Sequence, residues 1–539
     1  MRSLLLFIAA CSAPAPPPQQ PVVPRPPPPV AMPAPDAAPV PPPPGARGAA
    51  CSAEHACAEG LLCGPLPAGY CLSPCGATGA ACDGACVETG RAGELCMKSC
   101  TRDADCRTDE AYTCDPVWHA CALPNFAAIV PKQCPASGPP RDTAFGASEQ
   151  LSDATTPGIY QLEPSAVLGD DGNPIAMFIS RGSMFEGNVL GVARPGGARA
   201  TVKSAKQSEF DPWLARDAKG TVYAVWYGFD GRDQHGEIAL ATSRDRGATW
   251  SVPVDVHDPA DCADPEGECL DKPMIAIGPA PHGARGEVAY VFYSAEGGGL
   301  RVRASRDAGA TWSKPATALA GIYGNAAVGP DGRLHVIALD GGPLGAYGSA
   351  QQQVEYTVSS DGGATFGKPI VVSAREEMLP FFFANPSIAV DSRRGWLYVA
   401  YVRGGRDAVW DIVLAASRDG GKTWTRKALG DGCALHMVPN LALDPTTGFL
   451  HVAYYSSAPA AFVHQACTAG LASCTRAAPI NDQPFGALSL ERHGSKWVGE
   501  YESLFVDDKR RVLHAVWAQP IAEGDKVIAR IFSASAKLK

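Results

Sequence analysis

The octapeptide Ser243-Arg244-Asp245-Arg246-Gly247-Ala248-Thr249-Trp250 decides the fold, because the chain repeats its pattern three more times. The further copies occupy residues 305–312, 359–366 and 417–424, so successive copies start 54 to 62 residues apart. Every copy keeps serine, aspartate, glycine and threonine at the same four positions and ends in an aromatic residue. Repetition at this period is typical of architectures whose similar units bury their apolar faces against each other.

Around each copy the sequence predicts a larger unit of short strands. Apolar and polar residues alternate in short segments, and turns rich in Asp and Gly separate these segments. Between residues 136 and 539 we therefore expect seven four-stranded antiparallel blades. Residues 143–152 are expected to supply the outer strand that the last unit lacks. The inner strands of the units begin near Glu163, Asp211, Lys272, Asn325, Asn385, Pro439 and Glu502.

The pattern Ser-x-Asp-x-Gly-x-Thr-Trp resembles the Asp-box of the sialidase-like (BNR-repeat) propellers. The resemblance implies an all-β fold, a β-propeller, and it places the repeat in the outer hairpin of each blade, away from the catalytic face. Glycine tolerates a positive φ in such a hairpin, and short Ser or Asp side chains satisfy the N–H groups of the turn. Seven blades are predicted, with six as the alternative because catalytic sialidases have six.

The N-terminal residues predict export. Arg2 precedes the apolar residues 4–10, and Ile8-Ala9-Ala10-Cys11 resembles the lipobox of bacterial lipoproteins, whose cysteine is acylated. Residues 1–10 are therefore predicted to be a signal peptide, and Cys11 a lipid anchor in the bacterial cell envelope, with an ordinary cleaved signal as the alternative. Ser12 favours the outer membrane, on its periplasmic or its surface face. Residues 11–50 are mostly Pro, Ala, Val and Gln, which predicts a disordered tether.

Residues 51–135 are predicted to form a disulfide-rich module. Twelve of the 19 cysteines lie between residues 51 and 121, and the residues between them supply little apolar surface. An exported segment of this kind is stabilised by cross-links, so six disulfides are expected. Zinc is disfavoured, because no Cys-x2-Cys pair occurs and neither His55 nor His119 has ligand spacing. The cysteines beyond the module are expected to pair by proximity and elimination as Cys262–Cys269, Cys467–Cys474 and Cys134–Cys433.

Composition excludes several classes of partner and site. The 539 residues carry a net charge of −9 and contain no dense Lys/Arg cluster, so no nucleic acid partner is expected. No run of 18 apolar residues occurs, so no membrane-spanning helix is expected either. No cofactor and no metal site are predicted, and the chain is expected to be a monomer.

The sialidase resemblance implies candidate catalytic residues. Sialidases hold the carboxylate of their substrate with three arginines and cleave with a tyrosine nucleophile, a glutamate partner and an aspartate acid/base. Tyr501, Glu502 and Asp211 are the residues to which these roles carry over, with Glu500 as the alternative glutamate partner. The arginine that opens the first sialidase blade is missing, because Gln161 stands in its place. The segment around Tyr501 also resembles the Gly-Asp-Tyr-x-x-Leu opening of non-catalytic BNR propellers, so catalysis stays uncertain.

The starts of the inner strands supply a candidate binding face, because polar side chains beside aromatic rings suit a sugar. The first hypothesis is a non-catalytic binding or scaffold module for a glycan or an envelope protein. The second is an exo-acting, sialidase-like glycoside hydrolase on extracellular polysaccharide. A third possibility is that these side chains merely satisfy the strand ends. The candidate ligand-binding residues are Glu163, Trp213, Lys272, Asn325, Asn385, Asn440 and Glu500.

Overall fold

The computed structural model describes residues 43–123 and 140–539, apart from short stretches within both ranges. The predicted signal peptide, Cys11, most of the tether, Cys134 and Cys433 lie outside the described residues. Within the described part of the chain, no helix is both long and apolar enough to cross a bilayer. The stretches left out are residues 53–54, 65–67, 76–81, 90–92, 111, 116–117, 154–159, 182–186, 198, 231–235, 263–269, 296–298, 341–352, 374–384, 405–409, 431–433, 487–497 and 524–525.

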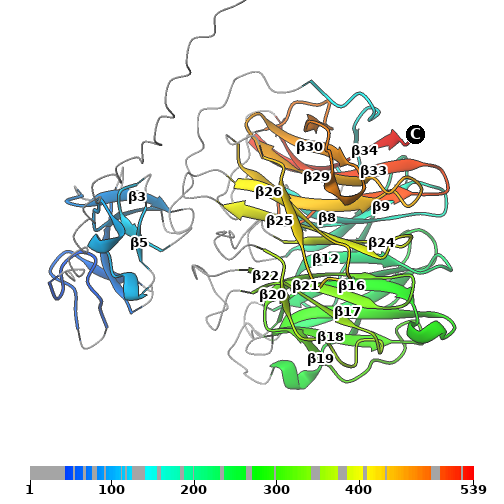
Figure 1. Ribbon diagram of the computed structural model, residues 1–539, viewed down its shortest axis with the longest axis horizontal. Helices are drawn as coiled ribbons and strands as arrows, with labels where there is room; N and C mark the ends of the chain where they lie inside the picture. The colour runs from blue at the N-terminus through cyan, green and yellow to red at the C-terminus, as the bar shows by residue number, and fades with distance from the viewer. Residues whose placement is uncertain are drawn as a thin grey trace, which may run out of the picture. The chain divides into compact units, whose positions relative to one another are not determined.

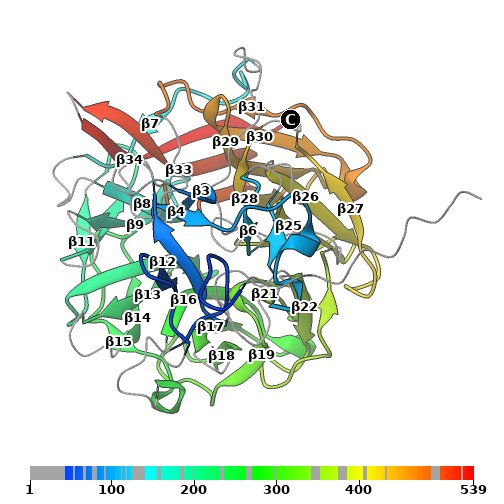
Figure 2. The same ribbon diagram turned by 90° about the vertical axis from the view of Figure 1, so that its left-hand side faces the viewer.

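The described residues from 149 to the C-terminus form seven units of four antiparallel strands (Figure 1). Five units are separate sheets, while the first and the seventh are joined by a single parallel pair, Tyr160 with Ala529. The first strand of each unit contacts the first strand of the next, and the last unit contacts the first, so these strands close a ring (Figure 2). This arrangement is a β-propeller, and the described units number seven, as the strand openings predict.

In the first six units the strands follow one another in chain order, from the centre of the ring outwards; in the seventh the outermost strand comes from the start of the domain. The first unit contains β8 (Tyr160–Leu168), β9 (Pro174–Arg181), β10 (Val189–Ala193) and β11 (Ala200–Val202). The second contains β12 (Ser208–Arg216), β13 (Val222–Phe229), β14 (Glu237–Ser243) and β15 (Val254–Asp255). The third contains β16 (Leu270–Pro279), β17 (Glu287–Ala295), β18 (Gly299–Ser305) and β19 (Ala316–Leu319). The fourth unit contains β20 (Ile322–Val328), β21 (Leu334–Asp340), β22 (Gln353–Ser359) and β23 (Ile370–Val371). The fifth contains β24 (Ser387–Asp391), β25 (Trp396–Gly404), β26 (Trp410–Ser417) and β27 (Thr425–Ala428). The sixth contains β28 (His436–Leu443), β29 (Leu450–Ser457), β30 (Ala460–Cys467) and β31 (Ala478–Pro479). The seventh contains β32 (Ser503–Asp507), β33 (Val512–Glu523), β34 (Lys526–Lys537) and β7 (Glu149–Gln150), and short 3₁₀ turns are η4 (Pro259–Cys262), η5 (Pro281–Gly283) and η6 (Ala469–Leu471).

The N-terminal strand β7 completes the seventh unit. Gln150 and Glu149 pair with Phe532 and Ser533 of β34, in the antiparallel sense. Buried Phe145 adds an isolated bridge to the same strand. The prediction that residues 143–152 close the ring is therefore confirmed, and the two ends of the propeller share one sheet.

The repeated octapeptide forms the same hydrogen-bonded turn in all four copies. In the second unit the Ser243 hydroxyl accepts the Gly247 N–H at 2.9 Å and donates to Asp245 at 2.9 Å. The Asp245 carboxylate in turn accepts the N–H of Thr249 at 2.9 Å and its hydroxyl at 2.5 Å. These bonds hold the pKa of Asp245 near 2, because its ionised form is the one that accepts them.

The glycine at the fifth position of each octapeptide packs on the preceding unit, so the repeat also joins neighbouring sheets. Gly421 has a φ of +90°, and a Cβ added there would lie 2.1 Å from the Tyr356 ring. At Gly363 the corresponding distance to Tyr290 is 3.3 Å. Glycine is therefore required at this position both for its backbone angle and for the close approach of the two units.

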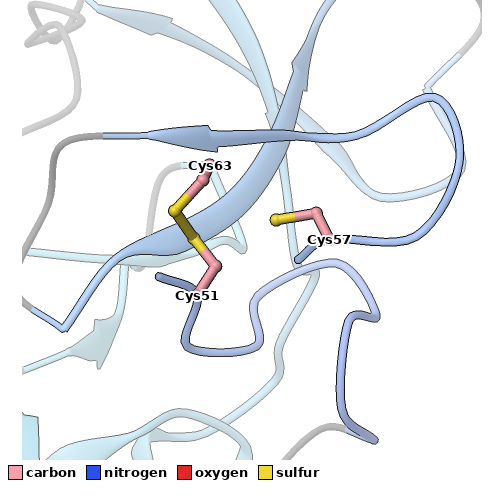
Figure 3. Close-up of side chains that lie close together, drawn as sticks. All are labelled: Cys51, Cys57 and Cys63. Carbon is pink, nitrogen blue, oxygen red and sulfur yellow. A yellow bond between two sulfur atoms is a disulfide. The ribbon is translucent and has the colours of Figure 1, made fainter. Parts of the chain in front are cut away.

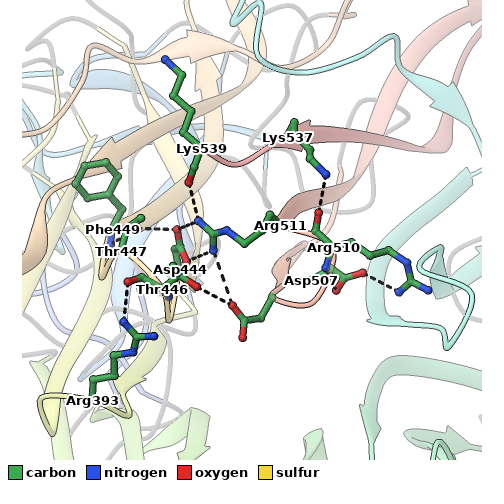
Figure 4. Close-up of polar contacts among 11 residues, drawn as sticks. Arg393, Asp444, Thr446, Thr447, Phe449, Asp507, Arg510, Arg511, Lys537 and Lys539 are labelled. Atoms are coloured by element: carbon green, nitrogen blue, oxygen red, sulfur yellow. Dashed lines mark hydrogen bonds and ion pairs between the residues drawn. The ribbon is translucent and has the colours of Figure 1, made fainter.

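A charged contact joins the turns of the sixth and seventh units (Figure 4). Arg511 pairs with both carboxylate oxygens of Asp444, at 2.5 and 2.7 Å, and donates to the Lys539 carbonyl at 2.9 Å. The Thr446 N–H and the Thr447 hydroxyl also donate to Asp444. Although burial opposes ionisation, these donors hold the pKa of Asp444 well below its usual range. The last residue of the chain is thereby held at the junction of two units.

The cysteine-dense module is a set of three four-cysteine units, one more than the two sub-repeats visible in the sequence. In each unit the first cysteine bonds the third and the second bonds the fourth, so the six predicted disulfides are confirmed. They are Cys51–Cys63, Cys57–Cys71, Cys75–Cys86, Cys82–Cys96, Cys100–Cys114 and Cys106–Cys121. The short strands and turns are β1 (Leu62–Gly64), β2 (Tyr70–Pro74), β3 (Ala85–Thr89), β4 (Gly93–Met97), η2 (Asp103–Asp105), η3 (Thr108–Glu110), β5 (Thr113–Cys114) and β6 (Cys121–Ala122).

The disulfides account for sulfur atoms that would otherwise suit a metal. The sulfurs of Cys51, Cys57 and Cys63 lie within 4.8 Å of one another, but Cys51 is bonded to Cys63 (Figure 3). Cys57 is bonded to Cys71, so none of the three is a thiolate that could bind zinc. The module also begins before residue 51, because the Gly48 N–H donates to the Cys71 carbonyl. In the propeller the predicted Cys467–Cys474 bridge is present; Cys262 is also disulfide-bonded, and its predicted partner Cys269 lies outside the described residues.

The two glycines of the fifth unit's octapeptide offer a matched test of the packing between units. Gly420 also has a positive φ, +75°, but has open space where a Cβ would lie. We expect Gly420→Ala to lower the free energy of unfolding by about 1 kcal/mol through backbone strain alone. Gly421→Ala should lower it by about 2–4 kcal/mol, because contact with Tyr356 adds to the same strain. Equal losses in urea unfolding would contradict the role assigned to this contact.

Replacing Asp444 should weaken the junction of the sixth and seventh units. Asp444→Asn is expected to lower the free energy of unfolding by about 1–3 kcal/mol, because charged hydrogen bonds to Arg511 are lost. Since the folded pKa of Asp444 is lowered, its contribution is present above about pH 4 and is lost as the pH falls below that value. Asp508→Asn, which changes an exposed carboxylate 3.8 Å from Arg511, should change stability by less than about 0.5 kcal/mol.

Candidate functional site

Equivalent residues on the inner strands adopt one unusual backbone conformation. Glu163, Asp211, Lys272, Tyr323 and Val438 have φ values between +45° and +57°, and each lies where the pairing with the second strand shifts register. A non-glycine residue with positive φ costs about 1–2 kcal/mol. Because the apolar residue Val438 adopts the same conformation, the bulge is a feature of the backbone fold and does not depend on the residue type. The residue type decides only which side chain each unit places at the bulge.

Lys272 occupies this position in the third unit, and the residues at the same position in three other units bring charged or aromatic groups around it. Its ammonium Nζ lies 2.6 Å from Asp211 Oδ1, 2.8 Å from Glu500 Oε2 and 4.0 Å from Glu163 Oε1. Tyr501, two residues before β32, occupies the place in the seventh unit that the bulge residues occupy in the others. We call this set the Lys272 cluster; its members are Glu163, Asp211, Asp271, Lys272, Glu500 and Tyr501.

Gly499 allows the seventh unit to approach the first at this cluster. Its φ is +103°, and a Cβ there would lie 2.2 Å from Glu163 Cγ. The N–H of Glu163 also donates to the carbonyl of Val498. The glycine before Glu500 and Tyr501 therefore sets how closely these two residues lie to Glu163.

Burial and mutual repulsion shift the ionisation of the cluster. Burial, opposed by Lys272 and helped by Asp211, raises the pKa of Glu163 well above its usual range. Burial and then the Asp211 charge raise the pKa of Asp271 to about 7. Burial alone would lower the pKa of Lys272, but the surrounding carboxylates outweigh it and raise this pKa well above the ordinary value. Lys272 is therefore charged at neutral pH, and the surroundings of Glu163 favour its protonated form.

Aromatic rings complete the cluster. Lys272 Nζ lies 5.8 Å from the centre of the Tyr501 ring and 5.9 Å from that of Tyr323, within reach of cation–π attraction. The Trp213 ring packs on Tyr501 with centroids 5.2 Å apart. The Tyr501 hydroxyl lies close to the Glu163 carboxyl without meeting the geometry of a hydrogen bond. Burial and the neighbouring carboxylates of the cluster raise the pKa of Tyr501 well above its ordinary value.

The structure brings together six of the ten residues predicted for the site and separates the others. Asn325, Asn385 and Asn440 belong to the fourth, fifth and sixth units, and no described hydrogen bond joins them to the cluster. The six that meet are Tyr501, Asp211, Glu163, Trp213, Lys272 and Glu500.

Glu502 does not serve Tyr501 as the catalytic prediction requires. Its carboxyl accepts hydrogen bonds from the Tyr455 hydroxyl and, at 3.0 Å, from the Ala518 N–H. The two adjacent side chains precede β32 and contact different units: Tyr501 packs on Trp213 of the second unit, whereas Glu502 bonds Tyr455 of the sixth. Asp211, predicted as the acid/base, instead forms an ion pair with Lys272.

Two members of the site were missed by sequence reasoning. Asp271 directly precedes Lys272, and Tyr323 precedes Gly324 where other units have the bulge residue followed by proline. The position directly before this proline or glycine was the available signal for Tyr323, since Pro follows Glu163, Asp211 and Lys272 alike.

Comparison with known proteins gives partial likenesses. No family model matches the chain. A sialidase of Micromonospora viridifaciens is 33% identical over 117 residues, which cover 19% of this chain and 18% of that protein. The chain thus matches less than a fifth of the length of that relative.

Among solved structures, the Hadza microbial sialidase Hz136 is 19% identical with a TM-score of 0.41, over 60% of this chain and 68% of that one. A protein of unknown function from Dyadobacter fermentans is 15% identical with a TM-score of 0.40, over 73% and 100%. The leech intramolecular trans-sialidase is 12% identical with a TM-score of 0.40, over 57% and 67%. These likenesses do not show which family this chain belongs to, and they do not identify its ligand.

The raised pKa of Asp271 predicts a specific dependence of stability on pH. A carboxyl whose pKa rises from 3.8 to about 7 on folding stabilises the protein below about pH 4, and this contribution is lost as the pH rises towards 7. Asp271→Asn removes the titration, so its free energy of unfolding should fall less than that of the wild type between pH 4.5 and 7.5. Urea unfolding at four pH values measures this difference. Identical pH profiles of variant and wild type would show that Asp271 does not titrate in this range.

Proposed function

We propose that the chain is an exported β-propeller protein that binds a carbohydrate at the Lys272 cluster without cleaving it. The observation that carries the proposal is the convergence of Glu163, Asp211, Lys272 and Tyr501, from four units, beside the Trp213 ring. Sugars are bound by such combinations, in which rings stack on the apolar face and charged groups bond the hydroxyls. The seven described units are the blades of this propeller.

A role without catalysis follows from the state of the candidate reactive groups. Tyr501 is a poor nucleophile, because burial and nearby carboxylates keep its phenol protonated. Asp211 is held by Lys272 at 2.6 Å, which favours its ionised form and makes it a poor acid. Glu502 is bonded to Tyr455 and Ala518. These contacts suit binding better than proton transfer.

A glycoside hydrolase of sialidase-like type is the alternative. It is favoured by the position of the Glu163 carboxyl beside the Tyr501 hydroxyl, since a tyrosine nucleophile needs a neighbouring base. The 117-residue likeness to a sialidase is compatible with it. In that case Glu163, and not Glu502, would be the partner of Tyr501.

The cellular setting remains a proposal from the sequence. Acylation of Cys11 would anchor the protein to the outer membrane of a bacterial envelope, with the Pro-rich residues after it as a tether. On that reading the propeller is a monomer at the periplasmic or surface face. An envelope protein is the alternative ligand to a glycan.

Tyr501→Phe tests binding and catalysis together, in the chain from residue 12 onwards, which lacks the predicted lipid anchor Cys11. The Tyr501 hydroxyl has no hydrogen-bond partner among the described residues, so its removal should leave the thermal midpoint unchanged or slightly raised. On a glycan array, followed by titration of the bound sugar, the variant should bind about tenfold more weakly, with no product from either protein by mass spectrometry.

Glu209→Gln is the matched control for Tyr501→Phe. Glu209 is also buried on an inner strand, but it bonds Trp226 and Ser204. Its replacement should leave sugar binding intact. Cleavage by the wild type that disappears in Tyr501→Phe would establish the hydrolase instead, and a wild type that binds no sugar would redirect attention to a protein ligand.

A further inference from the structure

The Lys272 cluster carries more negative than positive groups. Four carboxyl groups, contributed by four units of the ring, surround one ammonium. Glu163 and Lys272 are 1% and 7% exposed, so little water screens the charges. An anionic ligand would meet this excess of carboxylates directly, whereas a cationic ligand would reduce it.

Two buried polar atoms at the cluster lack partners among the described residues. Glu163 Oε1 faces Lys272 at 4.0 Å, while Oε2 of the same carboxyl accepts no hydrogen bond. The Tyr501 hydroxyl, in a residue 4% exposed, is also unbonded. Buried polar atoms without partners are rare and destabilising, so these two mark a place where a ligand can donate.

Lys272 itself shows which ligand chemistry the surrounding groups accept. Its ammonium is bound by carboxylates at 2.6 and 2.8 Å and lies over two tyrosine rings. Glu163 turns one carboxyl oxygen towards this ammonium and leaves the other unpaired. A carboxylate in that position can bridge two ammonium groups, because it lies between them and offsets their repulsion.

We infer that the Lys272 cluster takes a ligand with a primary ammonium group, which bonds Glu163 Oε2 and the Tyr501 hydroxyl. This inference deepens the proposed function and rests on it for the sugar: the ligand is then an amino sugar with a free amine. An N-acetylated sugar lacks the charge, and a carboxylated sugar has the wrong one. No bond between heavy atoms is made or broken in this step; when the ammonium binds, the O–H bond of a protonated Glu163 carboxyl breaks and the buffer accepts the proton.

The proton transfer involves groups on every element that faces Glu163. Lys272 favours the ionised form of Glu163, whereas the other acidic groups disfavour that form. A second ammonium shifts the balance towards ionisation of Glu163. Those acidic groups are Asp211 of β12, Asp271 of β16, and Glu500, Tyr501 and Glu502 at the start of the seventh unit.

Isothermal titration of the chain from residue 12 onwards tests the inference with three probes: fully deacetylated chitotetraose, N-acetylated chitotetraose and 3′-sialyllactose. At pH 7 we expect the deacetylated sugar to bind at least tenfold more tightly than the acetylated one, and sialyllactose not to bind. The measured enthalpy should change with the ionisation enthalpy of the buffer, because Glu163 releases its proton. Glu163→Gln should reduce the preference for the free amine to less than threefold and abolish the buffer dependence.

Glu209→Gln is again the control and should keep both the preference and the buffer dependence. Thermal unfolding establishes that each variant is folded, and Glu163→Asp replaces Glu163→Gln if the latter is not. Equal affinities for the two chitotetraoses, or tighter binding of sialyllactose, would overturn the inference and leave the proposed sugar binding standing. Titration with 1,5-diaminopentane separates the remaining cases: binding of this diamine alone supports the ammonium site and overturns the sugar, and binding of none of the probes overturns both.

Discussion

Closure of the ring is the constraint on which the rest of this propeller depends. Each four-stranded unit has two faces, and it can bury both only if a neighbour lies on either side. The first unit therefore needs the seventh, and the seventh is complete only when β7, from the start of the domain, pairs with β34. Two further contacts help to close the ring, because each joins one unit to the next. They are the contact of Gly421 with Tyr356 and that of Asp444 with Arg511.

Closure also creates the site. Five of the described inner strands share one bulge, and Tyr501 occupies the equivalent place in the seventh unit; the identities of these side chains differ because the bulge needs only the backbone. In one arc these side chains are Glu163, Asp211, Lys272 and Tyr501. Their charges depend on one another: removal of Lys272 would leave buried carboxylates unpaired, and removal of Asp211 or Glu500 would leave the ammonium short of a partner. Since rigid strands carry them, the groups are held in place before a ligand arrives.

Much of this arrangement was accessible from the sequence, and the errors have a common cause. The octapeptide predicted the turn, because its hydrogen bonds are local to eight residues, and the repeated strand openings predicted the number of units. The strand openings predicted Glu163, Asp211 and Lys272, each of which is followed by Pro, and the segment before β32 predicted Tyr501. Glu502 was misassigned and Asp271 was missed, because the direction of a side chain near a bulge depends on the local register, which no residue type reveals.

The sequence by itself determined the class of the fold, the closing strand and the cross-linked nature of the cysteine segment, because repeats, alternation and cysteine spacing are local properties of the chain. It also determined that the first inner strand offers Gln161 in place of an arginine. Only the tertiary structure decided which charged residues meet. Glu163 and Glu500 are 337 positions apart, and they share Lys272 only because the ring closes. Their ionisation follows from that meeting, since burial and neighbouring charges exist only in the folded protein.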